Sequence, residues 1–212
     1  ATNPRWRRTC AEWEGTVRDW VGAPEADAVL HSQVFFDLRP VHGESGLAAR
    51  VQREMLVRSK GSPRFQAHLA RIACEWQPPL GFLRGLVVAR RGEYRNTLDL
   101  KAGGIAPVVQ IARLYALSAG LDEVSTLGRL DAAATAGVIA RSDAENLIEA
   151  FRFLRGLALR HHARQIQEHS DLDNNVDPST LGTKDRHRLR AAFRIIAGAQ
   201  SALQIRYRVG QM

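Results

Sequence analysis

The chain has 212 residues, of which 45% are hydrophobic, so it can bury a sizeable core in one large domain or two small ones. No apolar run approaches the roughly 20 residues of a membrane-spanning helix, and the first residues lack the apolar core of a signal peptide, which together predict a cytoplasmic protein without a membrane partner. The net charge of +8 is carried almost entirely by arginine. The sequence begins without methionine, which favours a domain cut from a longer polypeptide.

The first predicted helix carries an apolar stripe rich in tryptophan. Asn3 and Pro4 have the residue types of an N-cap and a first helical position, and the sequence GAP at 22–24 is expected to end the helix. The apolar residues recur at spacings of three and four, on one helix face: Trp6, Cys10, Trp13, Val17 and Trp20. This stripe predicts a core or docking seam, with an aromatic base-stacking platform as the weaker alternative.

The helical pattern continues along most of the chain. Further helices are expected over residues 25–36, 45–59, 63–76, 105–119, 125–135, 142–168 and 184–207. The sequence SDAE at 142–145 predicts a capping box for the longest of them. Residues 80–101 break this rhythm and read either as a small hairpin or as an irregular insertion. The sum predicts an all-α, multi-helix bundle with a short irregular or hairpin insertion around residues 80–101, forming a single domain over 1–212.

Positive charge is concentrated next to this insertion. Residues 61–120 hold eight basic and three acidic side chains, and the excess centres on Arg84, Arg90, Arg91 and Arg95. Such a patch favours an anionic ligand or partner, although exposed, solvated arginines explain it equally well. A nucleic acid is the least favoured of these partners.

Two short runs place an acid and a base two residues apart around a leucine. They are FDLRP at 36–40, with Asp37 and Arg39, and TLDLKAGG at 97–104, with Asp99 and Lys101. In an extended backbone both charged side chains of a run leave on the same side. They then either face a ligand or pair with each other as structural salt bridges. The glycine pair at 103–104, just before a helical pattern, is expected to expose N–H groups that suit an anion.

No stand-alone catalytic constellation is present. The Gly-Ser at 61–62 is not followed by paired aspartates, and the sole Asp-x-Asp is at 171–173. The sequence contains no phosphate-binding loop, nucleophile elbow or zinc-like Cys/His cluster. The sequence therefore predicts no catalytic residue and no metal ligand in this chain, and leaves open whether the parent protein is an enzyme.

A secondary set of candidate residues lies near the C-terminal end. Arg160 and Arg164 are four residues apart on one helix face and could grip an acidic group. Between them, His161 and His162 point about 100° apart, which favours one inward and one outward ring. The loop DLDNNVDP at 171–178, with Asn174 and Asp177, reads either as a capping loop or as a cation or hydrogen-bonding site, although it does not match an EF-hand.

These motifs together carry a resemblance that spans nearly the whole chain in consistent order. The matching segments are NPRW at 3–6, FFDLRPVHG at 35–43, PLGF at 79–82, TLDLK at 97–101, AP at 106–107, Arg113, Leu117 and DNNVDP at 173–178. The chain resembles the bacterial putative nucleotidyltransferase substrate-binding domain.

The resemblance implies a particular setting. In that family a nucleotidyltransferase domain, similar to the catalytic part of PII-protein uridylyltransferases and glutamine synthetase adenylyltransferases, precedes the helical domain. Tandem CBS repeats or a cyclic-nucleotide-binding domain, typical of signal transduction, often lie further upstream. The catalytic aspartates and Mg²⁺ would then belong to the preceding domain, and this chain would need no cofactor.

The preferred hypothesis is a non-catalytic module that docks on the nucleotidyltransferase domain and holds the nucleotide or a protein acceptor. Arg39, Lys101 and Arg113 would contact phosphate, and Asp37 and Asp99 would orient those cations or a ribose hydroxyl. The secondary candidates are Arg160, Arg164, Asn174 and Asp177. The alternative is a regulatory scaffold that docks partners through the tryptophan face and the arginine patch, and a homodimer is left open. Nucleic-acid binding through residues 84–95 is a third option.

Overall fold

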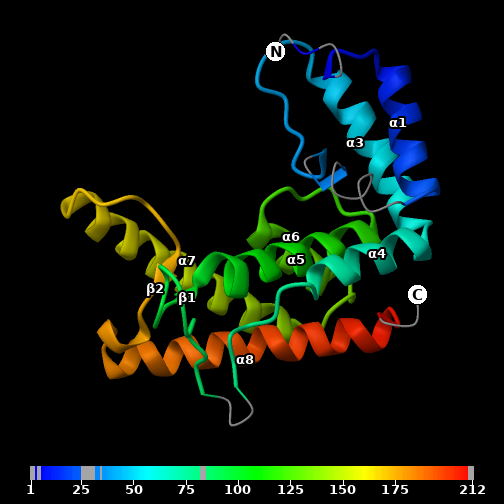
Figure 1. Cartoon of the computed structure of the whole chain (residues 1–212). Helices are drawn as coiled ribbons and strands as arrows, with labels where there is room; N and C mark the ends of the chain where they lie inside the picture. The colour runs from blue at the N-terminus through cyan, green and yellow to red at the C-terminus, as the bar shows by residue number, and fades with distance from the viewer. Residues whose placement is uncertain (1–2, 4–5, 25–31, 34, 82–84, 210–212) are drawn as a thin grey trace.

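The structure is a computed structural model that describes residue 3 and residues 6–24, 32–33, 35–81 and 85–209. The described α-helices are α1 (Cys10–Gly22), α3 (Ser45–Lys60), α4 (Pro63–Ala73), α5 (Ala106–Ala119), α6 (Thr126–Thr135), α7 (Arg141–Gln167) and α8 (Thr183–Arg206). The described strands, β1 (Leu98–Asp99) and β2 (Asn175–Val176), form one short ladder. The prediction of an all-α fold with an irregular stretch around residues 80–101 is confirmed (Figure 1).

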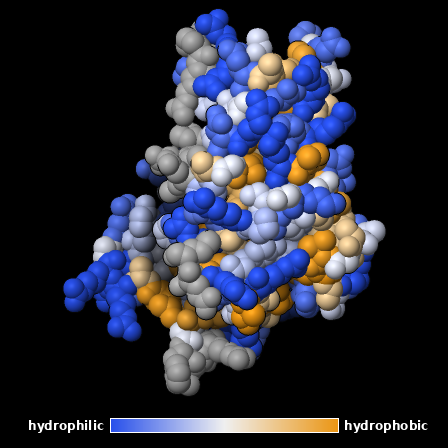
Figure 2. Space-filling view, turned by 90° about the vertical axis from the view of Figure 1, so that its right-hand side faces the viewer, coloured by the Kyte–Doolittle hydropathy of each residue, from blue (hydrophilic) through white to orange (hydrophobic). Residues whose placement is uncertain are grey.

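The helices form two parts. In Figure 1, α1 and α3, here called the N-terminal hairpin, stand out from the body formed by α4 to α8. The hairpin packs on the body through contacts of α3 with α4 and α5. Its outer side is mostly hydrophilic, whereas hydrophobic side chains gather lower on the same face, over the body (Figure 2).

Helix α5 is the centre of the body. Its residues from Ile111 to Leu117 are all buried, and it contacts α3, α4, α6 and α8. A helix that is apolar around its whole circumference has to be enclosed by others, which explains why the PVVQIARLYAL segment lies in the middle. Arg113 is the charged exception on this helix, with only 6% of its surface exposed.

Helix α1 begins later than the sequence predicted. Its N-cap is Thr9, whose side chain accepts a hydrogen bond from the backbone N–H of Glu12 while the Glu12 carboxylate returns the contact to the N–H of Thr9. This reciprocal capping box satisfies two helix-terminal donors, so the helix starts at Cys10, and the predicted start at Asn3 and Pro4 is wrong. Pro4 itself lies outside the described residues. The predicted end at Gly22 is confirmed.

The capping signals in the sequence predict the start of α4 correctly but not the start of α7. Ser62 caps α4 with Pro63 at its first position, as expected. The predicted capping box of α7 is wrong, because the helix begins at Arg141 after Ala140, which makes no side-chain cap. Most of the predicted helix over 25–36 lies outside the described residues, and residues 32–33 and 35 of it are helical.

The insertion over residues 80–101 pairs with a distant segment. The N–H of Ala89 donates to the carbonyl oxygen of Thr97 (2.9 Å), and the N–H of Asn96 donates to the carbonyl oxygen of Ala89 (2.8 Å). These two bonds close a turn, but the ladder itself forms between β1 and β2. In this antiparallel register Leu98 faces Val176 and Asp99 faces Asn175. The two motifs at 97–101 and 173–178 therefore lie side by side.

The glycine pair after β1 is packed and buried. Residues Lys101–Ile105 form a π-helical turn that leads into α5, and both glycines in it are buried. A Cβ on Gly103 would lie 2.7 Å from Pro79 Cδ, and one on Gly104 would lie 2.9 Å from Leu154 Cδ1. The expected anion cradle is therefore wrong: these glycines allow close packing of the turn against its neighbours.

Within the described residues no helix is both long enough and apolar enough to span a bilayer.

Candidate functional site

A polar groove lies where α7, the ladder and the start of α8 meet. We call it the α7–β2 groove, and its volume is about 430 Å³. Its lining residues are Thr97, Leu157, Arg160, His161, Arg164, Gln165, Glu168, Asn175, Val176, Asp177, Thr180, Leu181, Gly182 and Asp185. Three of the secondary candidates from the sequence, Arg160, Arg164 and Asp177, are therefore brought together here.

The alternation of the two strands explains why polar side chains reach the groove. Leu98 and Leu100 turn into the core, and Val176 is equally buried although it also lines the groove, with at most 4% of the surface of each exposed. Their neighbours Thr97 and Asn175 turn to the other side and line the groove, because successive strand residues point to opposite faces. The register extended by one residue places Thr97 opposite Asp177. Two sequence motifs thus form one wall.

The two aspartates of this wall cap the backbone. Asp99 Oδ1 accepts hydrogen bonds from the N–H groups of Lys101 (2.7 Å) and Ala102 (2.9 Å) at the start of the π-helical turn. Asp177 Oδ1 accepts from the N–H of Ser179 (2.7 Å), at the 3₁₀ turn Pro178–Thr180. Asp99 and Lys101 form no ion pair with each other, and the side chain of Lys101 is exposed.

The loop between α7 and β2 is fixed by both histidines. His161 Nε2 lies 3.1 Å from Asp173 Oδ1, and His162 Nε2 lies 2.8 Å from the Asp173 carbonyl oxygen. The prediction of one inward and one outward ring is wrong, because both rings are half-buried against this loop. The carbonyl oxygen of Asn174 accepts a hydrogen bond from the N–H of Leu100 (2.9 Å) and links the loop to β1.

The two arginines of the groove differ in whether they already have an ion-pair partner. Arg160 Nη2 lies 3.2 Å from Asp185 Oδ2, and both side chains are partly exposed. The side chain of Arg164 is exposed and makes no hydrogen bond or ion pair with another described residue. The groove can therefore offer Arg164 to an anionic group without breaking an existing contact, and its amides, hydroxyls and carboxylates can bind hydroxyl groups.

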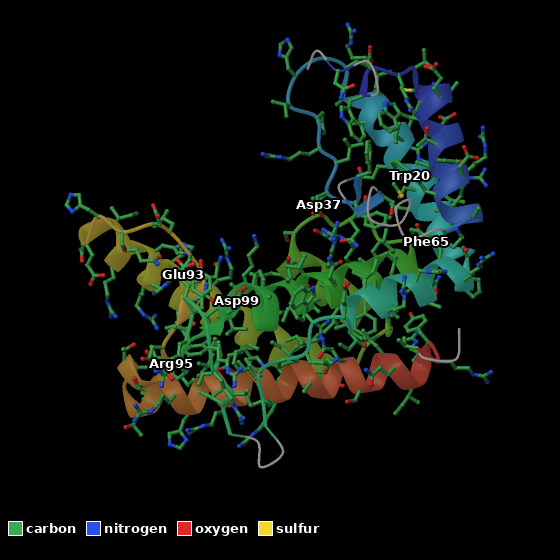
Figure 3. All side chains as sticks on the ribbon, in the orientation of Figure 1. Trp20, Asp37, Phe65, Glu93, Arg95 and Asp99 are labelled. Atoms are coloured by element: carbon green, nitrogen blue, oxygen red, sulfur yellow. The ribbon has the colours of Figure 1, made fainter. Side chains whose placement is uncertain are left out.

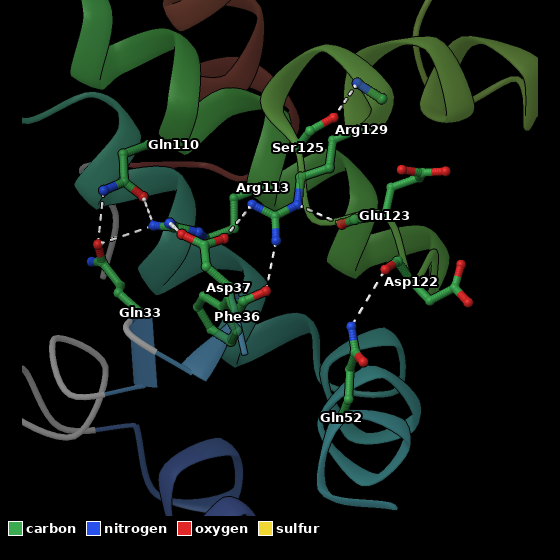
Figure 4. Close-up of polar contacts among 11 residues, drawn as sticks. Gln33, Phe36, Asp37, Gln52, Gln110, Arg113, Asp122, Glu123, Ser125 and Arg129 are labelled. Atoms are coloured by element: carbon green, nitrogen blue, oxygen red, sulfur yellow. Dashed lines mark hydrogen bonds and ion pairs between the residues drawn. The ribbon is translucent and has the colours of Figure 1, made fainter. Parts of the chain in front are cut away.

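A second polar cluster lies where the N-terminal hairpin meets the body (Figure 4). We call Asp37, Arg113 and Arg129 the Asp37 cluster. Asp37 Oδ2 lies 2.6 Å from Arg113 Nη2, and its Oδ1 lies 2.8 Å from Arg129 Nη1. The arginine side chains are 7% and 3% exposed, whereas that of Asp37 is 46% exposed. The carboxylate therefore covers two buried guanidinium groups.

Further contacts hold both arginines in place. Arg113 Nη1 donates to Gln110 Oε1 (3.1 Å) and Gln33 Oε1 (3.4 Å), and its guanidinium lies over the ring of Phe36. Arg129 donates to the carbonyl oxygens of Phe36 (2.7 Å) and Glu123 (2.8 Å). Burial lowers the pKa of Arg113, and the nearby positive charge of Arg129 lowers it further, whereas Asp37 opposes both effects.

Arg129 was missed by the sequence reasoning, although a signal was present. It is buried together with Leu130 and Ala133 on the inward face of α6. An arginine on the apolar stripe of a helix has to find an acidic or carbonyl partner, because a buried unpaired charge is costly. Its place on the apolar face of the helix could therefore have identified Arg129 as a candidate site residue from the sequence.

The predicted residues do not form one site. Figure 3 places Asp37 at the junction of the hairpin and the body, and Asp99 away from it at the ladder. Arg39 is exposed and makes no ion pair with another described residue. Asp37 and Arg113 meet, Asp99 and Lys101 lie beside the α7–β2 groove motifs, and the two sets are separate.

The tryptophan stripe packs around one phenylalanine. The ring centroid of Phe35 lies 4.4 Å from that of Trp13 and 5.0 Å from that of Trp20, and both tryptophans are partly buried. Trp6 stacks on Trp13 and is 45% exposed. The stripe is therefore at least in part a core seam, and its role in docking a partner stays a prediction.

The arginine patch is exposed where the structure describes it, at Arg90, Arg91 and Arg95, while Arg84 lies outside the described residues. Across the described ranges, no group of three His, Cys, Asp or Glu side chains is arranged to hold a metal ion.

Comparison with known proteins identifies the family. The model of the putative nucleotidyltransferase substrate binding domain matches residues 63–207, which correspond to the body and include both arginines of the Asp37 cluster and the whole α7–β2 groove. The motifs before residue 63, including Asp37 and Arg39, lie outside the matched range. No curated protein and no solved structure matches the chain. Since the match covers well over half of the 212 residues, the chain belongs to the family of putative nucleotidyltransferase substrate binding domains.

Proposed function

We propose that this chain positions a phosphate-bearing substrate for a nucleotidyltransferase and binds it in the α7–β2 groove. The observation that carries the proposal is the pairing of β1 with β2, which sets Thr97, Asn175 and Asp177 around the same groove as Arg160 and Arg164. The volume of about 430 Å³ lies within the range of small-molecule sites.

The chemistry of the groove suits a nucleotide. Arg164, which has no partner among the described residues, can bind a phosphate oxygen, and charge-assisted bonds of this kind are the stronger ones. The amide of Asn175 and the hydroxyl groups of Thr97 and Thr180 can bind ribose or base groups. Lys101, whose motif lies beside the groove, remains a proposed phosphate contact at the edge of the substrate, since its side chain is exposed. Arg39 is exposed as well, but it belongs to the separate set around Asp37, so its proposed phosphate contact would lie outside this groove.

The reaction itself is proposed to be performed by a nucleotidyltransferase domain of the same polypeptide, of the uridylyltransferase or adenylyltransferase type. Mg²⁺ would be held there by paired aspartates. Among the described residues, no group of three His, Cys, Asp or Glu side chains is arranged to hold a metal ion. The contribution of this chain is binding and orientation, which raise rates by fixing the reacting groups in place.

Nucleotide binding by the chain tests the proposal. Titration with ATP, GTP, CTP and UTP is expected to show binding of at least one of them. Arg164→Ala should weaken that binding about ten- to a hundredfold, as expected for one charge-assisted hydrogen bond. Lys101→Ala should have a smaller effect, and Arg39→Ala should leave binding in this groove unchanged. Transfer by the polypeptide that carries the catalytic domain should fall in parallel.

Arg155→Ala is the matched control. Arg155 lies on the same helix, is exposed and has no partner among the described residues, but it points about half a turn away from Arg164. Its loss should leave affinity unchanged. Equal affinities of wild type and Arg164→Ala would remove the groove from the proposal, and the absence of any nucleotide binding would favour the scaffold alternative.

A further inference from the structure

The Asp37 cluster carries more positive than negative charge. Arg113 and Arg129 contribute two charges, and Asp37 contributes one carboxylate that bridges them. Both guanidinium groups are buried, and the other described contacts of each are neutral amide or carbonyl oxygens. The cluster therefore holds one unbalanced positive charge beneath a half-exposed carboxylate.

Arg113 also has an unused donor. Its Nε is buried and has no hydrogen-bond partner among the described residues. A buried donor without a partner costs free energy, and such groups in native proteins call for an explanation. Together with the charge imbalance, this donor indicates that Asp37 satisfies the two arginines incompletely.

We propose that Arg113 and Arg129 form an oxyanion site of the phosphate class, which Asp37 occupies as an internal ligand and which a phosphate group can take over. A phosphate dianion matches both positive charges, and guanidinium groups bind phosphate oxygens in the forked geometry that also suits a carboxylate. This site is separate from the α7–β2 groove and does not depend on the function proposed for that groove.

The position of Asp37 makes this exchange feasible. Phe36 is 4% exposed and its ring is anchored against Phe65, while the side chain of Asp37 next to it is 46% exposed. The carboxylate can therefore turn into water by rotation of its own side chain while Phe36 stays in the core. The two arginines lie in the matched family domain, whereas their occupant comes from the preceding segment.

Removal of the internal competitor tests the proposal. In the full chain, Asp37→Asn keeps the shape of the side chain and removes its charge. We expect its dissociation constants for inorganic phosphate and pyrophosphate to be at least about tenfold lower than those of wild type, because a larger fraction of the site is open. Adding Arg113→Gln should abolish this gain. Titration calorimetry and phosphorus NMR measure both effects.

Four comparisons decide the outcome. Asp131→Asn removes a surface carboxylate paired with Arg141 and should leave the dissociation constants for phosphate and pyrophosphate unchanged. Arg164→Ala in the Asp37→Asn background should keep the gain, because a loss would place the anion in the α7–β2 groove and overturn the inference. Equal phosphate affinity of wild type and Asp37→Asn would overturn it as well. If pyrophosphate and phosphate bind at this site but nucleoside triphosphates do not, the natural ligand of the site is a free phosphate and not a nucleotide.

A variant that folds poorly still decides the question. Pyrophosphate should raise the unfolding midpoint of Asp37→Asn more than that of wild type, compared with chloride at equal ionic strength. A variant that stays unfolded, or whose midpoint pyrophosphate does not raise, would show that Asp37 has only a structural role.

Discussion

Asp173 ties helix α7 to the ladder through a single carboxylate. Its Oδ1 receives the contact from His161 and a 2.7 Å hydrogen bond from the N–H of Asn175, and its own N–H donates to Gln165 Oε1. Burial raises its pKa, but the hydrogen bonds from His161 and Asn175 outweigh burial, so the pKa is lowered from its ordinary value of 3.8. This residue therefore holds one wall of the α7–β2 groove in its ionised form.

The lowered pKa predicts an acid-dependent loss of stability. The carboxylate of Asp173 stabilises the fold fully above pH 3.8, its unfolded value, and this contribution is lost as the pH falls through the lower pKa of the folded state. The free energy of unfolding, measured by urea titration between neutral pH and pH 3, should decline less steeply in Asp173→Asn, which keeps the oxygen that faces Asn175. Parallel curves for the two proteins would contradict the assignment.

At the scale of elements, the π-helical turn Lys101–Ile105 depends on close packing. Gly104 has Leu154 Cδ1 and Phe193 Cε1 at 2.9 and 3.1 Å from where a Cβ would lie. These two side chains come from α7 and α8 and are fully buried. The turn can therefore join β1 to α5 in the middle of the body only because this position carries no side chain.

Substitution of Gly104 tests this packing. Gly104→Ala should lower the free energy of unfolding by about 1–3 kcal/mol, as overpacking does in well-filled cores. Gly198→Ala is the matched control, since Gly198 lies inside α8 with nothing within 4 Å of its Cβ position, and it should raise stability by about 0.5–1 kcal/mol. Both values come from urea unfolding. A neutral Gly104→Ala would mean that Leu154 and Phe193 can move aside.

At the scale of the whole molecule, the hairpin and the body share one core. The ring centroid of Phe36, which lies between α1 and α3 in the chain, is 6.1 Å from that of Phe65 in α4, at an interplanar angle of 71°. Val51 and Met55 of α3 belong to the same buried cluster. The arginines of the Asp37 cluster add a polar clamp at this junction. Loss of either part would expose the apolar surface of the other.

This shared core predicts cooperative unfolding. Three of the four tryptophans, Trp6, Trp13 and Trp20, report on α1 and its surroundings, and Trp76 reports on the end of α4, while far-ultraviolet circular dichroism reports on all helices. The two denaturation curves should coincide, and Phe65→Ala should lower the stability seen by both probes by about 3–5 kcal/mol. Two separate transitions, or a shift in one probe alone, would show that the hairpin unfolds independently.

Helix existence could be predicted from the sequence, and the boundaries could be predicted where the signal was local. Ser62 and Pro63 start α4 as expected, and α3 ends one residue beyond the predicted range of 45–59. The start of α1 was wrong because a capping box at Thr9 and Glu12 outweighed the Asn-Pro signal six residues earlier. Where two capping signals lie within one or two helical turns of each other, the helix starts at the one whose side-chain and backbone hydrogen bonds can both form.

The candidate site could be predicted only in part. The shared face of Arg160 and Arg164 follows from helical spacing, and both line the α7–β2 groove. The partners of Asp37 could not be derived, because they lie more than 70 residues away on α5 and α6. Spacing left open that Asp37 pairs with Arg39, whereas in the tertiary structure Asp37 pairs with the buried Arg113 and Arg129.

The sequence by itself determined the helical class, most helix positions and the family, because these depend on periodicity, caps and motif order along the chain. Only the tertiary structure decided that the motif at 97–101 pairs with residues 175–176, that the glycine pair is packed, and that two arginines converge on Asp37. The physical reason is that a charge or a strand edge is satisfied by whichever group the packed core brings close, and sequence spacing does not fix that group.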